Sequence, residues 1–310
     1  MSDYIQLVPS ILVESRHGGH HPRSLNKSFA GFRDVLDPAQ GVALLITNKY
    51  EGRNWPDDFK HSMSLEGAVK DSIHIRQFLE KFGPTMGVNA QAIDDASRKN
   101  IEDHIGKAIE SYPPLLITYF QGHGLYHPGM VIYVTSDGRE TETLEGLTAK
   151  EMVKMFSKST PGTKLLTITD FCYSGNVYGL KFVLNLGQDG SASWHKTDEC
   201  QWGEEIASPM LHIAGSLREE QVYETRNAGG YLTESLANLK AEPMSLPQIL
   251  LHLRQRVDYH LSIAKENPKY SSKFKGAKQV PQIYSNCMWP LDDPEILSKI
   301  GLGKNVPISY

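Results

Sequence analysis

Short, uninterrupted apolar runs rich in β-branched residues recur along the chain, separated by Gly, Pro and polar residues. Runs of this kind, without the alternation of a half-exposed strand, are typical of strands buried on both faces of a parallel sheet. The sequence therefore predicts a buried sheet. Its expected strands lie at residues 42–47, 115–121, 164–170, 210–215 and 281–285, with a weaker segment at 91–95 and a hairpin arm at 130–135.

Segments with the 3.6-residue period of amphipathic helices lie between these runs. The helix predicted at 64–82 is followed by Gly83 and Pro84, in the order expected after a helix C-terminus. Thr148 and Glu151 form a capping box that begins another helix. Further helices are expected at 97–112, 230–239 and 245–264. Because strands alternate with helices, the chain is predicted to be an α/β protein.

Two stretches have no sustained period. Residues 1–40 are rich in His, Gly, Ser and Pro, and their structure is unclear from the sequence. Clustered histidines in such a segment are more often incidental than metal ligands. Residues 185–208 carry Gly, Asp, Ser and Trp, and a long loop of this kind is usually functional or disordered.

Two of the predicted strands run directly into residues that carry chemistry. The strand at 164–170 ends at Asp170 and is followed by Cys172, and the strand at 115–121 is followed by His123 between two glycines. Catalytic groups of open parallel sheets lie at the carboxyl ends of strands. A Cys with a His about 50 residues upstream is also the caspase arrangement. The alternative is a core His and a core Cys that never meet.

The chain resembles caspase-fold cysteine peptidases, and metacaspases more than animal caspases. Gly122-His123-Gly124 matches the family's histidine motif. Residues 170–175, Asp-Phe-Cys-Tyr-Ser-Gly, match the metacaspase Asp-x-Cys-x-Ser-Gly rather than the caspase Gln-Ala-Cys-x-Gly. The match runs from about residue 41 to residue 286. It implies a three-layer α/β sandwich with a central, mostly parallel, six-stranded sheet and helices on both faces.

The resemblance also implies how the chain is divided. An N-terminal segment at 1–40 precedes a caspase-like peptidase domain at 41–290, and a C-terminal tail follows at 291–310. Within the domain, residues 41–182 are the large-subunit-like half, 183–209 a linker loop and 210–290 the small-subunit-like half.

By the same resemblance, Cys172 is the nucleophile and His123 the general acid/base. A thiol with a pKa of about 8.5 is mostly protonated at neutral pH, and a nearby histidine can take its proton and then protonate the leaving amine. The backbone N–H groups of Gly124 and Cys172 are expected to bind the oxygen of the tetrahedral intermediate.

Asp71 falls on the apolar stripe of the helix at 64–82, where a carboxylate is unfavourable unless it is paired or lines a polar pocket. It could instead favour the positive end of the helix dipole. The resemblance implies a substrate-pocket acid. Asp170 would be a second, although it could simply cap the next turn. Gln121, which replaces a metacaspase Ser, and Ser216 are expected to line the same pocket.

Two acids in the pocket suit a substrate Arg or Lys, with Arg the better match because its planar guanidinium can bind carboxylates bidentately. The sequence therefore predicts a cysteine endopeptidase that cleaves proteins or peptides after Arg or Lys. The alternative is a catalytically silent caspase-fold protein that acts as a binding or regulatory module. Lys196, the only basic residue of the 185–208 stretch, is a possible self-cleavage site.

No cofactor is expected to be required for this chemistry. Calcium is possible as an activator through Asp137 and Glu140, although the metacaspase acid beyond the nucleophile is missing, with Gly179 near its place. The net charge of −4 argues against nucleic-acid binding. No apolar run approaches the ~20 residues that span a bilayer, so no membrane partner is expected. Three cysteines and the lack of a signal peptide favour the reducing cytoplasm.

Overall fold

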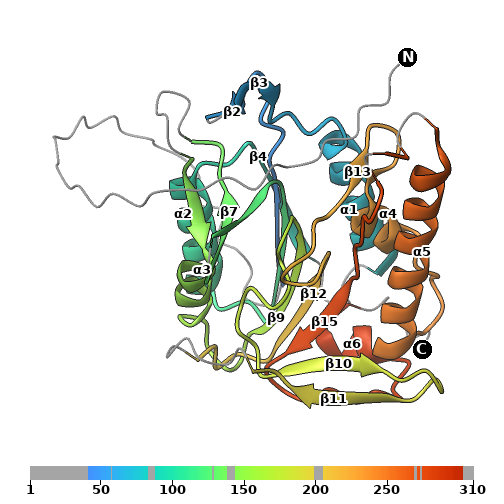
Figure 1. Ribbon diagram of the computed structural model, residues 1–310. Coiled ribbons are helices and arrows are strands. Elements are labelled where there is room, and N and C mark those ends of the chain that lie inside the picture. The colour runs from blue at the N-terminus through green and yellow to red at the C-terminus, as the bar shows by residue number, and fades with distance from the viewer. Residues whose placement is uncertain are drawn as a thin grey trace, which may run out of the picture.

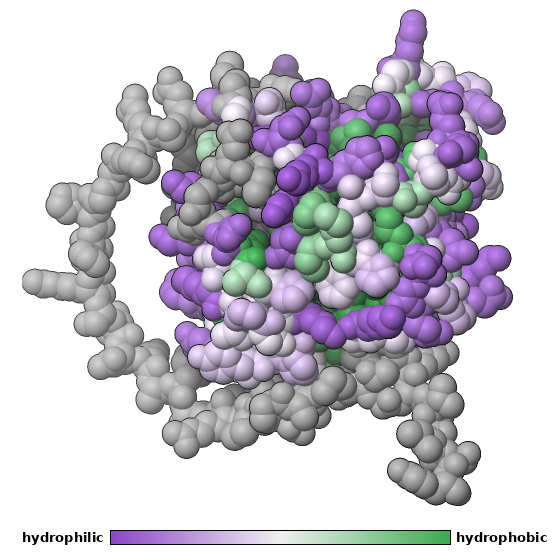
Figure 2. All heavy atoms as spheres, turned by 90° about the horizontal axis from the view of Figure 1, so that it is seen from below, coloured by the Kyte–Doolittle hydropathy of each residue, from purple (hydrophilic) through white to green (hydrophobic). Residues whose placement is uncertain are grey.

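The computed structural model describes residues 41–56, 58–82, 88–127, 129–137, 144–198, 205–268, 271–272 and 274–302. The predicted N-terminal segment, Glu140 and the last eight residues lie outside these ranges. Within the described part of the chain, no helix is both long and apolar enough to cross a membrane. On the face of the molecule in Figure 2, apolar residues form small separate groups among hydrophilic ones.

An eight-stranded sheet forms the centre of the molecule, in the order β11-β10-β15-β12-β9-β5-β1-β4 (Figure 1). The five strands from β12 to β4 run parallel to their neighbours, and β15, β10 and β11 add antiparallel pairs. The strands are β1 (Gly41–Thr47), β4 (Val88–Asp94), β5 (Leu115–Gln121), β9 (Lys164–Asp170), β10 (Phe182–Leu186), β11 (Ala192–Lys196), β12 (Met210–Ala214) and β15 (Gln282–Ser285). The mostly parallel sheet is confirmed, but the predicted number of six strands is wrong.

The two additional strands, β10 and β11, come from the segment that was predicted as a linker loop at 183–209. They form a hairpin in which Phe182 pairs with Lys196 and Leu186 pairs with Ala192. Along β10, buried Phe182 and Leu184 alternate with more exposed residues. This period of two is the signal of a strand, but it covers only a few residues before the turn that contains Gly190.

Helices cover both faces of the sheet (Figure 1). Side chains of α2 (Arg98–Glu110) and α3 (Ala149–Phe156) pack with Leu44 and Leu116 in one core. On the other face, the core around Leu45 and Ile117 includes residues from four helices. These are α1 (Ala68–Phe82), α4 (Tyr231–Ala237), α5 (Leu246–Glu266) and α6 (Ile296–Ile300). The alternating faces of each strand thus build two cores, and the predicted three-layer sandwich is confirmed.

The predicted C-terminal tail at 291–310 is part of this fold at least as far as residue 302. Ile296, Ile300 and Leu302 are fully buried in the same core as α1 and α5. The Gly301 backbone, which ends α6, approaches the side chain of Leu115 at the start of β5. Helix α6 was not predicted because its five residues are too few to show the 3.6-residue repeat of apolar positions.

Three small sheets extend the loops of the main fold. One contains β6 (Gly124–His127), β7 (Met130–Val134) and β8 (Gly146–Thr148), and begins directly after His123. The hairpin of β2 (Asn54–Trp55) and β3 (Asp58–Ser62) follows β1. The third pairs β13 (Glu224–Thr225) with β14 (Gly229–Gly230), immediately before α4.

Candidate active site

The parallel pairing of β5 with β9 brings the two predicted catalytic residues to one place. Gln121 and Asp170 are partners at the last position of this pairing, so the residues that follow them leave the sheet side by side. His123 and Cys172 both line a small cavity of about 30 Å³ there. The two residues therefore share one cavity at the end of the sheet, which favours the interpretation as a catalytic pair.

His123 is held on three sides. Its Nε2 lies 2.6 Å from the carbonyl oxygen of Met63, and because a carbonyl only accepts, Nε2 carries the proton and Nδ1 is the basic nitrogen. The imidazole stacks on Tyr50 at 4.7 Å between ring centroids, and the Trp55 ring lies at 4.8 Å. Burial lowers the pKa of His123 to about 4, and the charge of Arg53 acts in the same direction. The ring is therefore neutral at pH 7.

Cys172 is buried, with 2% of its surface exposed. Its sulfur accepts a hydrogen bond from the backbone N–H of Val222 at 3.4 Å. Burial raises the pKa of the thiol to about 12, and the nearby Asp170 and Glu224 charges add to this. In this conformation the thiol is protonated at neutral pH.

Gly124 lies against the backbone of the nucleophile. A Cβ atom added at this glycine would lie 2.0 Å from the Cys172 carbonyl oxygen and 2.8 Å from the Phe171 ring, so no other residue permits this approach. The two residues predicted to supply the oxyanion-binding N–H groups are consequently neighbours in space.

Three carboxyl groups line the same cavity: the predicted Asp71 and Asp170, and Glu224. Asp71 accepts the Gly230 N–H at 2.6 Å through Oδ1, and its buried Oδ2 has no partner. Asp170 accepts the N–H and hydroxyl of Thr233 through Oδ2, and its Oδ1 has no partner. Asp170 is therefore tied to the start of α4 and does not cap the turn that follows it.

Glu224 is held in the same way, because its Oε1 accepts the Gly67 N–H at 3.1 Å. Glu224 was not predicted from the sequence. It lies in an aperiodic segment, and it reaches the cavity through the pairing of β13 with β14, two strands of only two residues each. Gly230 in β14 allows this strand to lie close to Asp170, since a Cβ atom at Gly230 would be only 2.4 Å from Asp170 Oδ2.

All three carboxyls have raised pKa values. Burial is the main cause for each, and repulsion from the neighbouring acids adds to it for Asp71 and Glu224. The pKa of Asp170 is raised to about 6 and that of Glu224 to about 7, while that of Asp71 lies well above its usual range. The described residues that line the cavity include no Lys or Arg to offset this negative charge.

A caspase-domain family model matches residues 40–289, most of the 310-residue chain. The chain belongs to the caspase family. Among solved structures, the domain is similar to caspase-1 from Spodoptera frugiperda at 15% sequence identity, with a TM-score of 0.52; the match covers 85% of this chain and 93% of that one. Protein GSU0716 from Geobacter sulfurreducens matches at 14% identity with a TM-score of 0.48, over 86% and 100% of the two chains. A search of curated sequences gave no significant match.

Of the two other residues predicted to line the pocket, Gln121 lines the cavity and Ser216 does not. The buried Oε1 of Gln121 has no partner. Ser216 is fully buried and its hydroxyl has no partner either.

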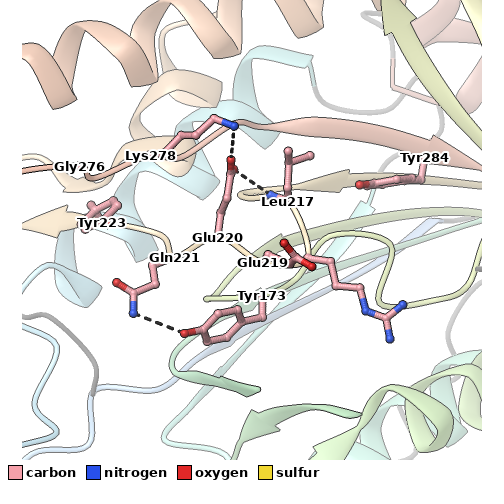
Figure 3. A pocket seen from close by; sticks show the side chains of 10 residues that line it. Tyr173, Leu217, Glu219, Glu220, Gln221, Tyr223, Gly276, Lys278 and Tyr284 are labelled. Carbon is pink, nitrogen blue, oxygen red and sulfur yellow. Dashed lines mark hydrogen bonds and ion pairs between the residues drawn. The ribbon is translucent and has the colours of Figure 1, made fainter. Parts of the chain in front are cut away.

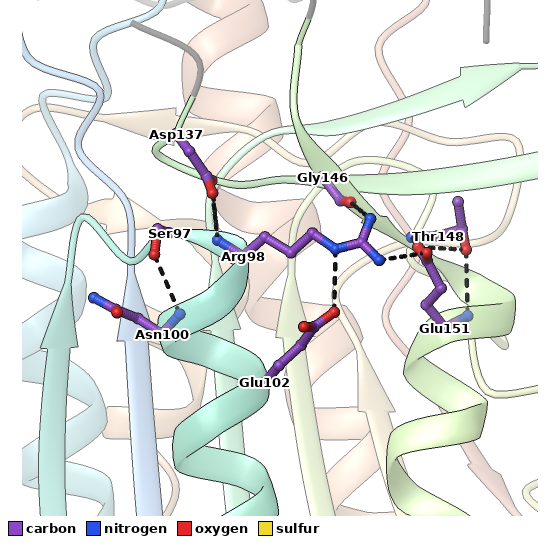
Figure 4. A network of polar contacts seen from close by, with 8 residues as sticks. All are labelled: Ser97, Arg98, Asn100, Glu102, Asp137, Gly146, Thr148 and Glu151. Carbon is purple, nitrogen blue, oxygen red and sulfur yellow. Dashed lines mark hydrogen bonds and ion pairs between the residues drawn. The ribbon is translucent and has the colours of Figure 1, made fainter. Parts of the chain in front are cut away.

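Asp137, the possible calcium ligand, lies at the start of a helix. Both of its carboxylate oxygens accept the Arg98 N–H at the start of α2, each at 2.9 Å (Figure 4). The Arg98 guanidinium in turn binds Glu102 and Glu151, which connects α2 to α3. Among the residues that the structure describes, no group of three or more His, Cys, Asp or Glu side chains is arranged to hold a metal ion.

Lys196, the possible self-cleavage site, is the last residue of β11. It is exposed and pairs with Phe182 across the hairpin. The next residue is fixed as well, because the Thr197 N–H donates to the Lys181 carbonyl at 3.0 Å. The bond that would be cut therefore lies in hydrogen-bonded structure rather than in a free loop.

The segment from Leu217 to Tyr223 also borders a second, wider hollow of about 740 Å³ (Figure 3). Tyr173, the residue after the nucleophile, lies on one side of it, and its hydroxyl accepts from Gln221 at 3.4 Å. On another side, Glu220 forms an ion pair with Lys278. Tyr223 lines both this hollow and the small cavity that contains Cys172 and His123.

Proposed function

We propose that this caspase domain is a metacaspase-like cysteine endopeptidase that cleaves proteins or peptides after Arg or Lys, using Cys172 and His123. The observation that carries the proposal is the set of three carboxyls beside the dyad. Two of them, Asp71 and Asp170, have a buried oxygen without a partner. Buried acids are normally paired, so this cavity is suited to a cation that the substrate brings.

The chemistry follows from the protonation states of the two residues. Neutral His123 takes the thiol proton on Nδ1 while the sulfur attacks the substrate carbonyl carbon. The carbonyl oxygen gains negative charge, which the N–H groups of Gly124 and Cys172 would stabilise. His123 then gives the proton to the leaving amine, and a water molecule hydrolyses the acyl-enzyme by the same steps. The Met63 carbonyl holds the imidazole in the required tautomer throughout.

The number of acceptors favours Arg over Lys. A guanidinium has five N–H donors in a planar fork, whereas an ammonium has three. Asp71 Oδ2, Asp170 Oδ1 and Gln121 Oε1 are all buried and unpartnered. Glu224 lines the same cavity and adds a third carboxyl group. Several acceptors from different directions match the fork better than they match a single point charge.

The cavity has to enlarge before it can accept a side chain. A volume of about 30 Å³ holds little more than a water molecule. Its wall is formed in part by Val222, Tyr223 and Glu224, and Val222 also contacts the nucleophile. We therefore propose that this wall moves outward as the substrate enters.

The test uses fluorogenic peptides that differ only in the residue before the cut: Arg, Lys, citrulline or Asp. We expect Arg to be cleaved faster than Lys, and citrulline and Asp to be cleaved very slowly. Removing one partner from a buried ion pair is unfavourable by about 3 kcal/mol. Asp71→Ala should therefore lower kcat/KM for the Arg peptide about a hundredfold. Faster cleavage after Asp than after Arg would show that the pocket assignment is wrong.

Variants of the dyad control this test. Cys172→Ala should abolish turnover, His123→Ala should reduce it nearly as much, and the double variant should add little because the pair acts as a unit. An arginyl chloromethyl ketone should label only Cys172. If a folded protein neither cleaves nor is labelled, the catalytically silent binding module is the better description.

The proposed chemistry does not require a metal, so the same rates are expected with and without a calcium chelator. Because Asp137 is occupied at the start of α2, an effect of calcium through this residue would have to disrupt the helix cap. A nucleophilic thiol and the absence of a sequence-predicted disulfide framework favour a reducing, cytoplasmic location.

A further inference from the structure

Tyr50 has an unusual backbone conformation beside the catalytic histidine. It follows β1 and has a φ of 52°, a left-handed value that is rare for a bulky residue. The side chain is almost completely buried, with 1% of its surface exposed. Local strain of this kind persists only where the surrounding structure enforces it, and such residues cluster at functional sites.

The surrounding structure enforces it through Asp95. One carboxylate oxygen, Oδ1, accepts the N–H of Lys49 at 2.7 Å and that of Tyr50 at 3.2 Å. The Tyr50 carbonyl accepts the Arg53 N–H at 3.1 Å. Donors and acceptors on both sides of the residue therefore hold this turn, and they direct the phenol ring inward.

The phenol contacts His123 in two ways. Its ring stacks on the imidazole at an interplanar angle of 28°, and its hydroxyl oxygen accepts the His123 backbone N–H at 3.0 Å. The hydroxyl proton is donated to the Val134 carbonyl at 2.6 Å, which fixes the direction of the oxygen's lone pairs. The hydroxyl also lies close to Gly122, where an added Cβ would be only 2.6 Å away.

We propose that Tyr50 is a positioning residue for His123, so that its hydroxyl and ring together fix the imidazole with Nδ1 toward Cys172. This inference rests on the proposed peptidase function. Met63 fixes one ring nitrogen, and Trp55 lies against the imidazole at a tilt of 55°. The Tyr50 stack restricts the ring further, and the hydroxyl anchors the backbone from which the ring extends.

A second tyrosine in the same hydrogen-bonded region offers a matched control. Tyr133 is fully buried, its hydroxyl donates to the Gln121 carbonyl at 2.9 Å, and it accepts from Asn48 Nδ2 at 3.0 Å. Tyr133 thus has one donated and one accepted bond, whereas the Tyr50 hydroxyl also accepts a longer bond from Asn48 Nδ2 at 3.5 Å. No contact between the Tyr133 side chain and His123 is observed. Tyr50→Phe and Tyr133→Phe remove the same atom from similar surroundings.

The experiment compares kcat and KM of both variants on the Arg peptide, together with their denaturant unfolding. Tyr50→Phe should lower kcat by about tenfold or more with KM little changed, because misalignment of a general base acts on the chemical step. Tyr133→Phe should lose comparable stability but keep kcat within about threefold of wild type. Equal effects on kcat in the two variants, or no effect in Tyr50→Phe, would overturn the proposal.

Two further measurements keep the test decisive. Asp95→Asn is the second variant, used if Tyr50→Phe does not fold. It weakens the hydrogen bonds from the Lys49 and Tyr50 N–H groups, so it should lower kcat by a smaller factor than Tyr50→Phe. Side-chain ¹⁵N NMR, with the His123 signals assigned through His123→Ala, should show shifted imidazole signals in Tyr50→Phe and not in Tyr133→Phe. The NMR signal does not depend on turnover, so it tests Tyr50 separately from the activity. A wild type that cleaves no peptide would refute the peptidase function, whereas unchanged imidazole signals in Tyr50→Phe would refute the role of Tyr50.

Discussion

Asp71, Asp170 and Glu224 line one small cavity, where burial disfavours the ionised form of each and neighbouring acids add to this for Asp71 and Glu224. Each is fixed through one oxygen by a backbone or hydroxyl donor, so the repulsion cannot be relieved by a change of rotamer without breaking that bond. An arrangement of this kind lowers the stability of the empty protein and becomes favourable when a cation enters. Two predictions follow from this residue-level conflict.

The first concerns pH. Asp170 and Glu224 have pKa values of about 6 and about 7, so both lose protons as the pH rises from about 5.5 to about 8. Ionised carboxylates attract a guanidinium and protonated ones do not. The kcat/KM ratio of the Arg peptide to the citrulline peptide should therefore rise over this range. Because His123 and Cys172 act on both peptides, the ratio cancels their titration, and a constant ratio would contradict the pocket.

The second concerns stability. A carboxyl whose folded-state pKa is raised contributes stability below its unfolded pKa, and this contribution is lost as the pH rises through the folded value. Asp71→Asn should therefore raise the free energy of unfolding by about 1 kcal/mol at pH 8, and less at pH 5. The amide can still accept the Gly230 N–H and can donate to a neighbouring carboxylate. Glu80→Gln, on the exposed side of the same helix, is the control and should show no such pH-dependent gain.

At the level of elements, the sequence predicted those features that a local pattern encodes. The buried runs of β5 and β9 and the capping box of α3 were visible in the residues themselves, and so was the position of the dyad at two strand ends. The β10–β11 hairpin, α6 and Glu224 were not, because each rests on a few residues whose partners are distant in the chain. Glu224, for example, contacts Gly67, more than 150 positions earlier.

The hairpin leads to a prediction about self-processing. A peptidase binds an extended, unpaired segment, whereas Lys196 is paired in β11. Cleavage between Lys196 and Thr197 should therefore be slow in the wild type. Trp194→Ala removes a side chain that packs against the core and donates to the Trp289 carbonyl at 2.8 Å, so it should accelerate this cleavage.

The new N-terminus at Thr197 is detected by sequencing after incubation. Ser193→Ala, on the same strand, is the control for a general effect of substitution, and Cys172→Ala distinguishes self-cleavage from a contaminating peptidase. Rapid cleavage of the wild type at Lys196 would mean that the pairing does not protect this bond.

For the whole molecule, the two cores are joined by the sheet, and the last described residues complete one of them. Deletion of residues 295–310 would remove three fully buried apolar side chains, Ile296, Ile300 and Leu302. At roughly 1.5 kcal/mol for each, the free energy of unfolding should fall by about 4.5 kcal/mol. Denaturant unfolding measures the loss, and deletion of 303–310 alone separates the contribution of α6 from that of chain length. Equal stability of the two truncated proteins would contradict the packing described for α6.

The order of the strands also limits how copies of this protein could meet. A free strand edge is a template on which another chain can add by backbone hydrogen bonds. β15 has β12 on one side, and on the other side its Tyr284 and Ser285 pair with β10. In the described part of the chain, β4 and β11 are the end strands of the sheet, and β11 carries exposed His195 and Lys196. Assembly by sheet extension through β15 would first require the β10–β11 hairpin to detach.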